Sequence, residues 1–176
     1  MSTKVVTKKV RFSYANVWNP TAVEEGQEKK YNTSILIPKT DTVTIEKIEK
    51  AIETELEILK GKNNGKLPKK YHNPLKDGDE EYPEDENYHG MMYLRAASKT
   101  QPGIVDKDTE PILNQDEFYS GCWGRASLNF YVFNLDMNKG VGVGLNHVQK
   151  LEDGEHLGGG RASAEDDFAD DDDDLI

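Results

Sequence analysis

Large rings, a guanidinium and small polar groups alternate with apolar residues between positions 123 and 133. Successive side chains of a β-strand point to opposite faces, so the even positions of this segment form one apolar face. The odd positions are Trp123, Arg125, Ser127, Asn129, Tyr131 and Phe133. A core would exclude Arg and Asn, and a plain solvent face rarely carries so many rings. Rings stack on unpaired bases and cations bind phosphates, so this face is typical of single-stranded nucleic-acid binding.

The same mixture recurs in two other segments. Tyr93, Arg95 and Lys99 share one face of residues 91–99, and Lys9 and Arg11 share one face of residues 4–18. An alternative interpretation stays open, in which the rings complete a second packing layer against a helix or a partner subunit.

A lysine-rich stretch follows at residues 59–76, with six lysines, no acidic residue and Tyr71 among them. Such a stretch is suited to sequence-independent binding of a phosphate backbone, although the same composition is also common in mobile surface loops. The candidate DNA contacts in this stretch are Lys62, Lys66, Lys69, Lys70 and Tyr71.

The residues that catalysis would need are scattered. The four histidines (His72, His89, His147 and His156) have no metal-ligand spacing with each other or with the lone Cys122. No nucleophile elbow or phosphate-binding GxxxxGK[ST] loop is present, and the glycines at 140–144 alternate with Val141 and Val143 as in a strand. We therefore predict a non-enzymatic protein with no catalytic residue, no metal and no cofactor. His147 is interpreted as a structural imidazole within a strand.

Acidic residues are concentrated in two segments. The net charge is −11, but residues 165–176 hold eight acidic groups and residues 77–86 hold seven more. The rest of the chain has 22 basic and 18 acidic residues, a net charge of +4. This asymmetry predicts a mildly basic folded body with two acidic appendages.

The hydrophobic pattern predicts a mainly β domain with one helix. Strands are expected over 4–18, 29–37, 91–99, 122–134 and 140–151, with a short one near 103–107. Apolar residues recur at threes and fours over 42–60, which predicts an amphipathic helix. A flexible loop is expected over about 61–90. An OB-fold-like five-stranded barrel over residues 1–151 fits this inventory, as does a β-sandwich, with a flexible acidic tail over 152–176.

Four stretches carry a family resemblance: KYNTSILIPKTD (30–41), PLKDGDEE (74–81), YSGCWGRASLNFYVFN (119–134) and KGVGVGLNHVQKLEDGEHLGG (139–159). In this order they resemble a family of bacteriophage single-stranded-DNA-binding proteins with an OB-fold, formerly a domain of unknown function. The likeness to the T7-type phage protein is more distant. The resemblance implies a non-enzymatic role in phage DNA replication or recombination, in the cytoplasm of the infected bacterium. It does not identify individual DNA contacts.

The end of the chain, EDDFADDDDDLI, combines carboxylates with apolar residues. We expect this tail to compete with DNA for the basic surface and, once displaced, to recruit phage or host replication and recombination proteins. A purely solubilising role is the alternative. The tail residues assigned to partner binding are Phe168, Asp170, Asp171, Asp172, Asp173, Asp174, Leu175 and Ile176.

Other functions remain open at this level. An acidic interaction or regulatory protein that mimics DNA would bind no nucleic acid, and an RNA-binding member of the same fold would prefer RNA. No stretch approaches the length of a membrane span, so no membrane partner is expected. The single cysteine allows no internal disulfide and suits a reducing compartment. A homodimer is compatible with the sequence.

Overall fold

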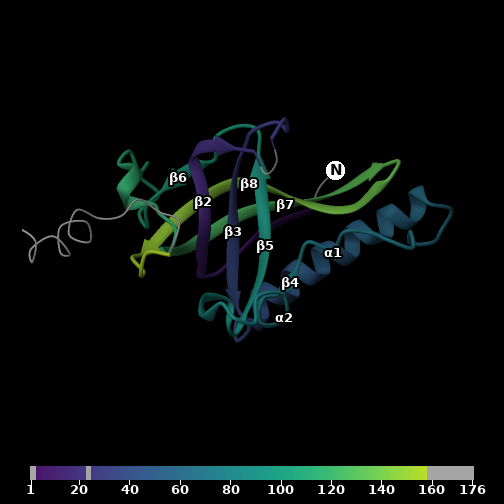
Figure 1. Ribbon diagram of the computed structural model, residues 1–176, viewed down its shortest axis with the longest axis horizontal. Helices are drawn as coiled ribbons and strands as arrows, with labels where there is room; N and C mark the ends of the chain where they lie inside the picture. Colours follow the sequence, from purple (N-terminus) through teal and green to yellow (C-terminus); the bar gives the residue numbers. More distant parts are fainter. Residues whose placement is uncertain (1–2, 23–24, 158–176) are drawn as a thin grey trace, which may run out of the picture.

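Five strands pair into a closed ring in the computed structural model, which describes residues 3–22 and 25–157. Around the ring the order is β7, β2, β3, β5, β8 and back to β7. In Figure 1, β2, β3 and β5 run side by side and cross over β7 and β8. The predicted OB-fold-like barrel is therefore confirmed, and the β-sandwich is not. The bounds are β2 Val10–Thr21, β3 Lys30–Pro38, β5 Met91–Ser98, β7 Trp123–Leu135 and β8 Asn138–Glu152.

Three short strands join this ring at its edges. β1 (Thr3–Val6) pairs with β7, β4 (Lys76–Asp77) with β5, and β6 (Gly103–Val105) with β8. The predicted strand over 4–18 is thus divided into β1 and β2. The division has a geometric reason: β1 pairs with residues 127–130 of β7, whereas β2 pairs with residues 123–124 of β7 and turns away along β3.

The core fills the interior of the barrel. Even-numbered Ala126, Leu128 and Phe130 of β7 are buried there, as the alternation predicted. The rings of Phe12 and Phe118 meet in the same core with centroids 4.9 Å apart. Each such side chain contributes about 1.5–3 kcal/mol through burial, so these positions determine which face of each strand is left outside.

Helix α1 (Thr42–Lys62) packs against β1, β7 and β8. It begins at Asp41, whose carboxylate accepts a hydrogen bond from the backbone amide of Thr44 at 3.1 Å. Ile48 and Ile52 belong to the barrel core, so the apolar stripe predicted over 42–60 faces inward. Within residues 3–22 and 25–157, no helix combines the length and the apolar character that a membrane crossing requires.

Residues 63–90 contain more regular structure than the sequence suggested. β4 is followed by the short helix α2 (Gly78–Glu81) and by a 3₁₀ turn, η1 (Glu86–Tyr88); a second such turn, η2 (Gln115–Glu117), precedes β7. The Lys39 ammonium lies 2.8 Å from the Asp77 carboxylate and 2.7 Å from that of Asp79. The acidic segment 77–86, predicted from the sequence as an appendage of the folded body, is thereby anchored to the end of β3.

The packed part of the chain continues beyond Leu151, where we predicted the domain boundary. The Tyr119 hydroxyl donates to the Asp153 carboxylate and accepts a hydrogen bond from the Gly154 amide at 3.1 Å. Leu157 is buried against Leu36 on the outside of the barrel. Residues 153–157, which we call the strap, therefore lie on the body of the domain.

The Lys39 contacts predict a specific pH dependence of stability. Hydrogen bonding to Lys39 lowers the pKa of Asp77 and of Asp79 below 3.8 in the folded state. This stabilisation is fully present above the unfolded-state pKa and is lost as the pH falls through the folded-state values. We expect Lys39→Gln to make the urea unfolding free energy less dependent on pH between pH 5 and pH 2 than in wild type. Lys60→Gln, which removes an exposed pair with Glu57, is the control; equal pH dependence in wild type and Lys39→Gln would contradict the prediction.

Candidate nucleic-acid interface

The odd-numbered residues of β7 lie outside the barrel core, as their alternation predicted. Arg125 and Tyr131 are exposed, and Trp123, Asn129 and Phe133 are half-buried. None of the five is part of the core cluster. The predicted mixed face therefore exists. Whether each of its residues is open to a ligand depends on the side chains that pack next to it.

The outer side of the β7–β8 hairpin combines a ring with a bare strand. Tyr131 pairs with Gly142, and a Cβ atom added at Gly142 would lie 2.5 Å from Tyr131 Cζ, so the ring lies across this glycine. Gly144 pairs with Asn129, whose amide nitrogen donates to the Asn146 side-chain oxygen at 3.0 Å. With 41% of Tyr131 exposed, its ring is open to a stacking partner.

A row of polar residues crosses β3 and β5 outside the barrel core, with Asn32 and Ser34 buried and Arg95 exposed. Ser34 pairs with Arg95 and Asn32 pairs with Ala97, and the four residues define what we call the strand face. Arg95 donates from Nη2 to the Asn32 side-chain oxygen at 2.7 Å, which holds the guanidinium over β3.

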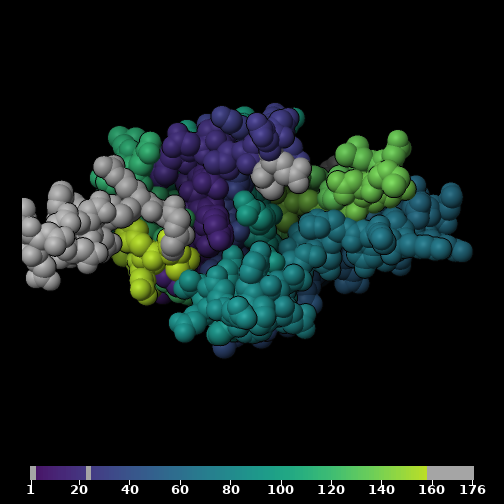
Figure 2. All heavy atoms as spheres, in the orientation of Figure 1, coloured from purple at the N-terminus to yellow at the C-terminus, as the bar shows by residue number. Residues whose placement is uncertain are grey.

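The strand face opens into a depression of 460 Å³. Its lining residues are Thr21, Gln27, Glu28, Lys30, Asn32, Arg95, Ala96 and Ala97. In Figure 2 the dark blue segment that joins β2 to β3 lies at the upper edge of the molecule. Lys99 lies 3.7 Å from the Glu28 carboxylate in an exposed ion pair. A surface with two lining cations and one carboxylate can receive phosphates, and exposed pairs of this kind exchange partners at little cost.

The strand face and the hairpin form one continuous outer surface. Ala97 of β5 pairs with Gly144 of β8, and Gly144 pairs with Asn129 of β7. The neighbours across these strands are small, so no large side chain separates Arg95 from Tyr131 along this row. The structure thus brings together Arg95, Asn129 and Tyr131 from the predicted set.

Trp123 lies in a different environment. The Lys9 ammonium and the Arg11 guanidinium each lie 5.5 Å from the centre of its ring, and Lys9 is ion-paired with Glu152. Arg11 donates to the backbone oxygen of Gly121 at 3.0 Å and to that of Glu155 at 2.7 Å. These three predicted residues therefore form a separate group that contacts the strap and one another.

Tyr93 is held in a cluster of tyrosines. Its ring centre lies 5.5 Å from that of Tyr82 and 5.2 Å from that of Tyr88. Burial raises the pKa of Tyr88 to about 12 and also raises the pKa of Tyr93. The structure does not bring Tyr93 together with Tyr131, because the segment after α2 packs on its ring.

The lysine-rich stretch contacts the β7–β8 hairpin near its turn, at Lys139 and Gly140. His72 forms a bridge with Gly140: its amide donates to the Lys139 oxygen at 2.8 Å, and its own oxygen accepts from the Val141 amide at 3.0 Å. The His72 ring lies 6.2 Å from that of Phe133, and burial lowers its pKa, with Lys76 adding to the shift. The predicted residues of the stretch are exposed next to this junction: Lys62, Lys66, Lys69, Lys70 and Tyr71.

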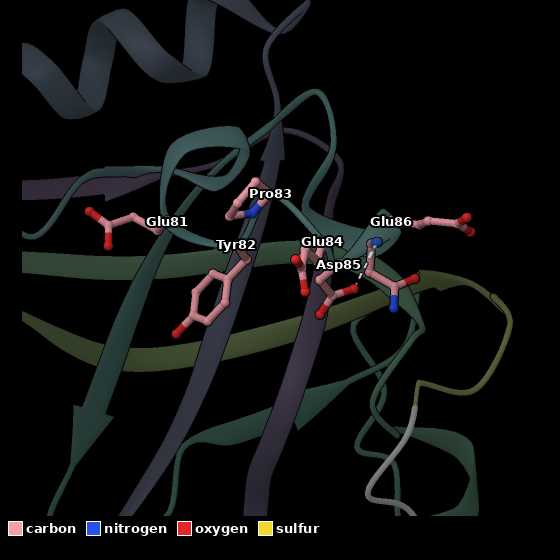
Figure 3. Close-up of a pocket in the computed structure, with 7 residues that line it drawn as sticks. Glu81, Tyr82, Pro83, Glu84, Asp85 and Glu86 are labelled. Atoms are coloured by element: carbon pink, nitrogen blue, oxygen red, sulfur yellow. Dashed lines mark hydrogen bonds between the residues drawn. The ribbon is translucent and has the colours of Figure 1, made fainter.

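Depression size alone does not identify the interface. A larger hollow of 610 Å³ is lined by residues 81–87, four of which are acidic. Figure 3 shows Glu81 and Glu86 directed to opposite sides and the carboxylates of Glu84 and Asp85 close together. This hollow would repel phosphates, whereas the strand face carries Lys30 and Arg95.

Cys122 and His147 have structural surroundings. Burial raises the pKa of the Cys122 thiol to about 11, and His147 Nδ1 accepts a hydrogen bond from the Gly103 amide at 3.1 Å. Among the described residues, no three His, Cys, Asp or Glu side chains are grouped so that they could hold a metal ion. The tail residues Phe168 and 170–176 lie outside the described residues.

Sequence reasoning missed the contribution of β3. Lys30, Asn32 and Ser34 alternate with Thr33, Ile35 and Ile37, and this alternation predicts a polar outer face. Gly142 and Gly144 were interpreted only as strand residues that alternate with Val141 and Val143. Their role as the bare strand beside Tyr131 depends on the register of the hairpin.

Comparisons with known proteins place the chain in a family. Residues 3–176 match the family described as "Enterobacter phage Enc34, ssDNA-binding protein". The chain belongs to this family. It is 34% identical over 176 residues to putative protein p50 of Acyrthosiphon pisum secondary endosymbiont phage 1, covering 95% of this chain and 93% of that one.

Solved structures share the fold. The single-stranded DNA-binding protein from bacteriophage Enc34, in complex with ssDNA, has a TM-score of 0.76 and 27% identity, covering 88% of this chain and 89% of that chain. The single-stranded DNA binding protein gp2.5 of bacteriophage T7 has a TM-score of 0.61 and 16% identity, covering 97% and 94%. At that identity the T7 protein supports the fold alone. The family resemblance predicted from the sequence is confirmed.

The contacts of Arg11 predict that it holds the strap of this family member in place. Arg11→Gln removes charge-assisted hydrogen bonds to Gly121 and Glu155, each worth about 1.5–3 kcal/mol. The Leu157 amide, which donates to the Ser120 oxygen, should then exchange with deuterium about tenfold faster or more. Arg125→Gln, which removes a bond to the Thr7 oxygen, should leave that amide unchanged. Unaltered protection in Arg11→Gln would show that the strap is held by other contacts.

Proposed function

We propose that this protein binds single-stranded DNA without sequence preference, on the strand face and the outer side of the β7–β8 hairpin. The observation that carries the proposal is the continuous row from Arg95 through Ala97 and Gly144 to Asn129, with Tyr131 open beside it. Proteins of the OB-fold bind oligonucleotides on the face of the second and third barrel strands and on adjacent loops. Here those strands are β3 and β5. The DNA complex of the related Enc34 protein supports this choice of ligand.

Phosphates and bases are assigned to different parts of the surface. Arg95 and Lys30 line the depression of the strand face, and Lys99 stands at its rim with Glu28. These cations contact the phosphates. Tyr131 stacks on a base, because its ring lies against Gly142 and is 41% exposed. Stacking accepts any base, so binding of this kind carries little sequence preference.

The remaining predicted residues extend this assignment. Two further parts lie near the His72–Gly140 bridge and lengthen the path of the DNA along the hairpin. They are Phe133 and the lysine-rich stretch with Lys62, Lys66, Lys69, Lys70 and Tyr71. The group of Trp123, Lys9 and Arg11 contributes to DNA binding only where the DNA reaches the strap. The reason is that the two cations already contact the Trp123 ring. Tyr93 acts by supporting β5 through its tyrosine neighbours.

The acidic tail is assigned a competing and a recruiting role. Eight carboxylates in residues 165–176 form a tethered polyanion that occupies the cationic surface in the absence of DNA. Displaced by DNA, the tail presents Phe168, Leu175 and Ile176 to phage or host replication and recombination proteins. The protein acts in the cytoplasm of the infected bacterium by binding and recruitment, without catalysis. Self-association into a homodimer is compatible with this role.

Tyr131 provides the sharpest test of the stacking surface. Tyr131→Ala should weaken binding to an oligo-dT strand by about 1–3 kcal/mol, or roughly 5- to 150-fold in Kd, through loss of one base stack. The matched control is Tyr82→Ala, because Tyr82 is 46% exposed but lies in the acidic segment. Fluorescence anisotropy titrations report both. Equal affinity of wild type and Tyr131→Ala, with both folded, would place the stacking ring elsewhere, and tighter binding to a matched RNA strand would redirect the proposal to RNA.

Removal of residues 165–176 tests the tail. At low salt the truncated protein should bind oligo-dT more tightly than the full chain, because the competing polyanion is gone. The difference should shrink as salt is raised, since screening weakens the tail more than it weakens base stacking. A truncated protein with unchanged affinity across the salt series would remove the competition from the proposed function and leave DNA binding itself intact.

A further inference from the structure

A second depression lies between helix α1 and the edge strand β1. It has a volume of 400 Å³, and four of its lining residues are cations: Lys4, Lys47, Lys50 and Arg125. The other lining residues are Thr3, Val5, Val6, Ala51 and Thr54. No carboxylate is among them. We call this depression the α1–β1 cleft.

The four cations of the α1–β1 cleft are available to a ligand. Within residues 3–22 and 25–157, none of them forms an ion pair. The i,i+4 pair between Glu46 and Lys50, which the sequence suggests, is not formed. Arg125 uses Nε to donate to the Thr7 oxygen at 2.9 Å, which directs the guanidinium without neutralising it.

Charge is segregated around helix α1. Lys47, Lys50 and Thr54 are spaced at i, i+3 and i+7 and line the cleft, so they share one stripe of the helix. Four of the five acidic residues of the helix, Glu46, Glu49, Glu53 and Glu57, recur on another stripe and are exposed to solvent. The fifth, Glu55, is buried and accepts a hydrogen bond from the Thr3 hydroxyl at 3.3 Å. The charges that α1 exposes in the cleft are therefore positive, although the helix as a whole is not.

The cleft continues the surface proposed for DNA. Lys4 of β1 pairs with Asn129 of β7, and Tyr131 is the next outward residue along that strand. A chain that passes Tyr131 and Asn129 therefore meets Lys4 on the adjacent strand. From there the cleft leads to Lys47 and Lys50 on the helix.

The chemistry of the cleft selects the backbone of a nucleic acid. No aromatic ring lines it, so bases have no stacking partner there, while ammonium, guanidinium and hydroxyl groups bind phosphates without reading sequence. We infer that the α1–β1 cleft binds the phosphates of a second segment of the same DNA strand, beyond the segment that stacks on Tyr131. The inference rests on the proposed function and extends it to a longer binding site.

The test compares two strand lengths with full-length protein. Lys47→Gln with Lys50→Gln removes two charges from the exposed side of α1, and Lys107→Glu makes the same net change in the loop after β6. Oligo-dT of about 6 nucleotides covers only the strand face and hairpin, whereas about 25 nucleotides exceeds one OB-fold site. For the long strand, the slope of log K against log salt should fall by about 1.4 in the double variant, and for the short strand it should stay unchanged. Lys107→Glu should leave both slopes unchanged.

Each other outcome overturns the inference in a distinct way. Equal slopes of wild type and double variant for both lengths mean that no phosphate is bound in the cleft. An equal decrease of the salt slope for the short oligonucleotide places Lys47 and Lys50 in the same site as Tyr131. If the double variant loses only the binding of an added peptide of residues 165–176, the cleft is a dock for acidic peptide. If wild type binds neither oligonucleotide, the proposed function itself has failed. Circular-dichroism melting is the control that shows whether every variant is folded.

Discussion

The pairing of β7 with three partners is the constraint on which the rest of the structure depends. β7 forms hydrogen-bonded ladders with β1, β2 and β8, and thereby closes the sheet. Leu128 and Phe130 are fully buried by this closure, at about 1.5–3 kcal/mol each. A slip of one residue would turn them to solvent and bring Arg125 and Asn129 inside. The chemistry of the outer face is thus fixed by the packing of the inner one.

The same closure explains how the hairpin can carry the proposed stacking surface and still pack against the core. Val141, Val143 and Leu145 of β8 face inward and provide the packing that holds the hairpin to the domain. The outward positions between them are therefore free to be glycine. Gly142 lets the Tyr131 ring lie against the strand, where a larger residue would collide with it at 2.5 Å. Stability and site come from opposite faces of one strand, so the glycines at 142 and 144 cost the core nothing.

Local alternation in the sequence was sufficient to predict the approximate positions of the five barrel strands, the helix and which side of β7 lies outside, although β1 was merged with β2 and β4 was missed. It was insufficient to predict neighbours, because cross-strand partners come from distant parts of the chain. Tyr93 alternates like Tyr131, yet its ring packs on Tyr82 and Tyr88. Arg125 and Arg95 occupy equivalent outward positions in their strands but line separate depressions. Trp123 is engaged by the strap, whose path across the barrel has no periodic signal in the sequence.

The position of the acidic segment gives the strand face a direction. Residues 77–86 are anchored by Lys39 and pack next to Tyr93, so carboxylates border the beginning of β5. Two residues further along the same face stands Arg95, and Lys99 follows just after the strand ends. The potential along β5 therefore rises from negative near residue 91 to positive near residue 99. A polyanion is repelled at the first end and attracted at the second, which supports the proposed path of DNA across β5 near Ala97, over Gly144 and Gly142 of β8, to Tyr131.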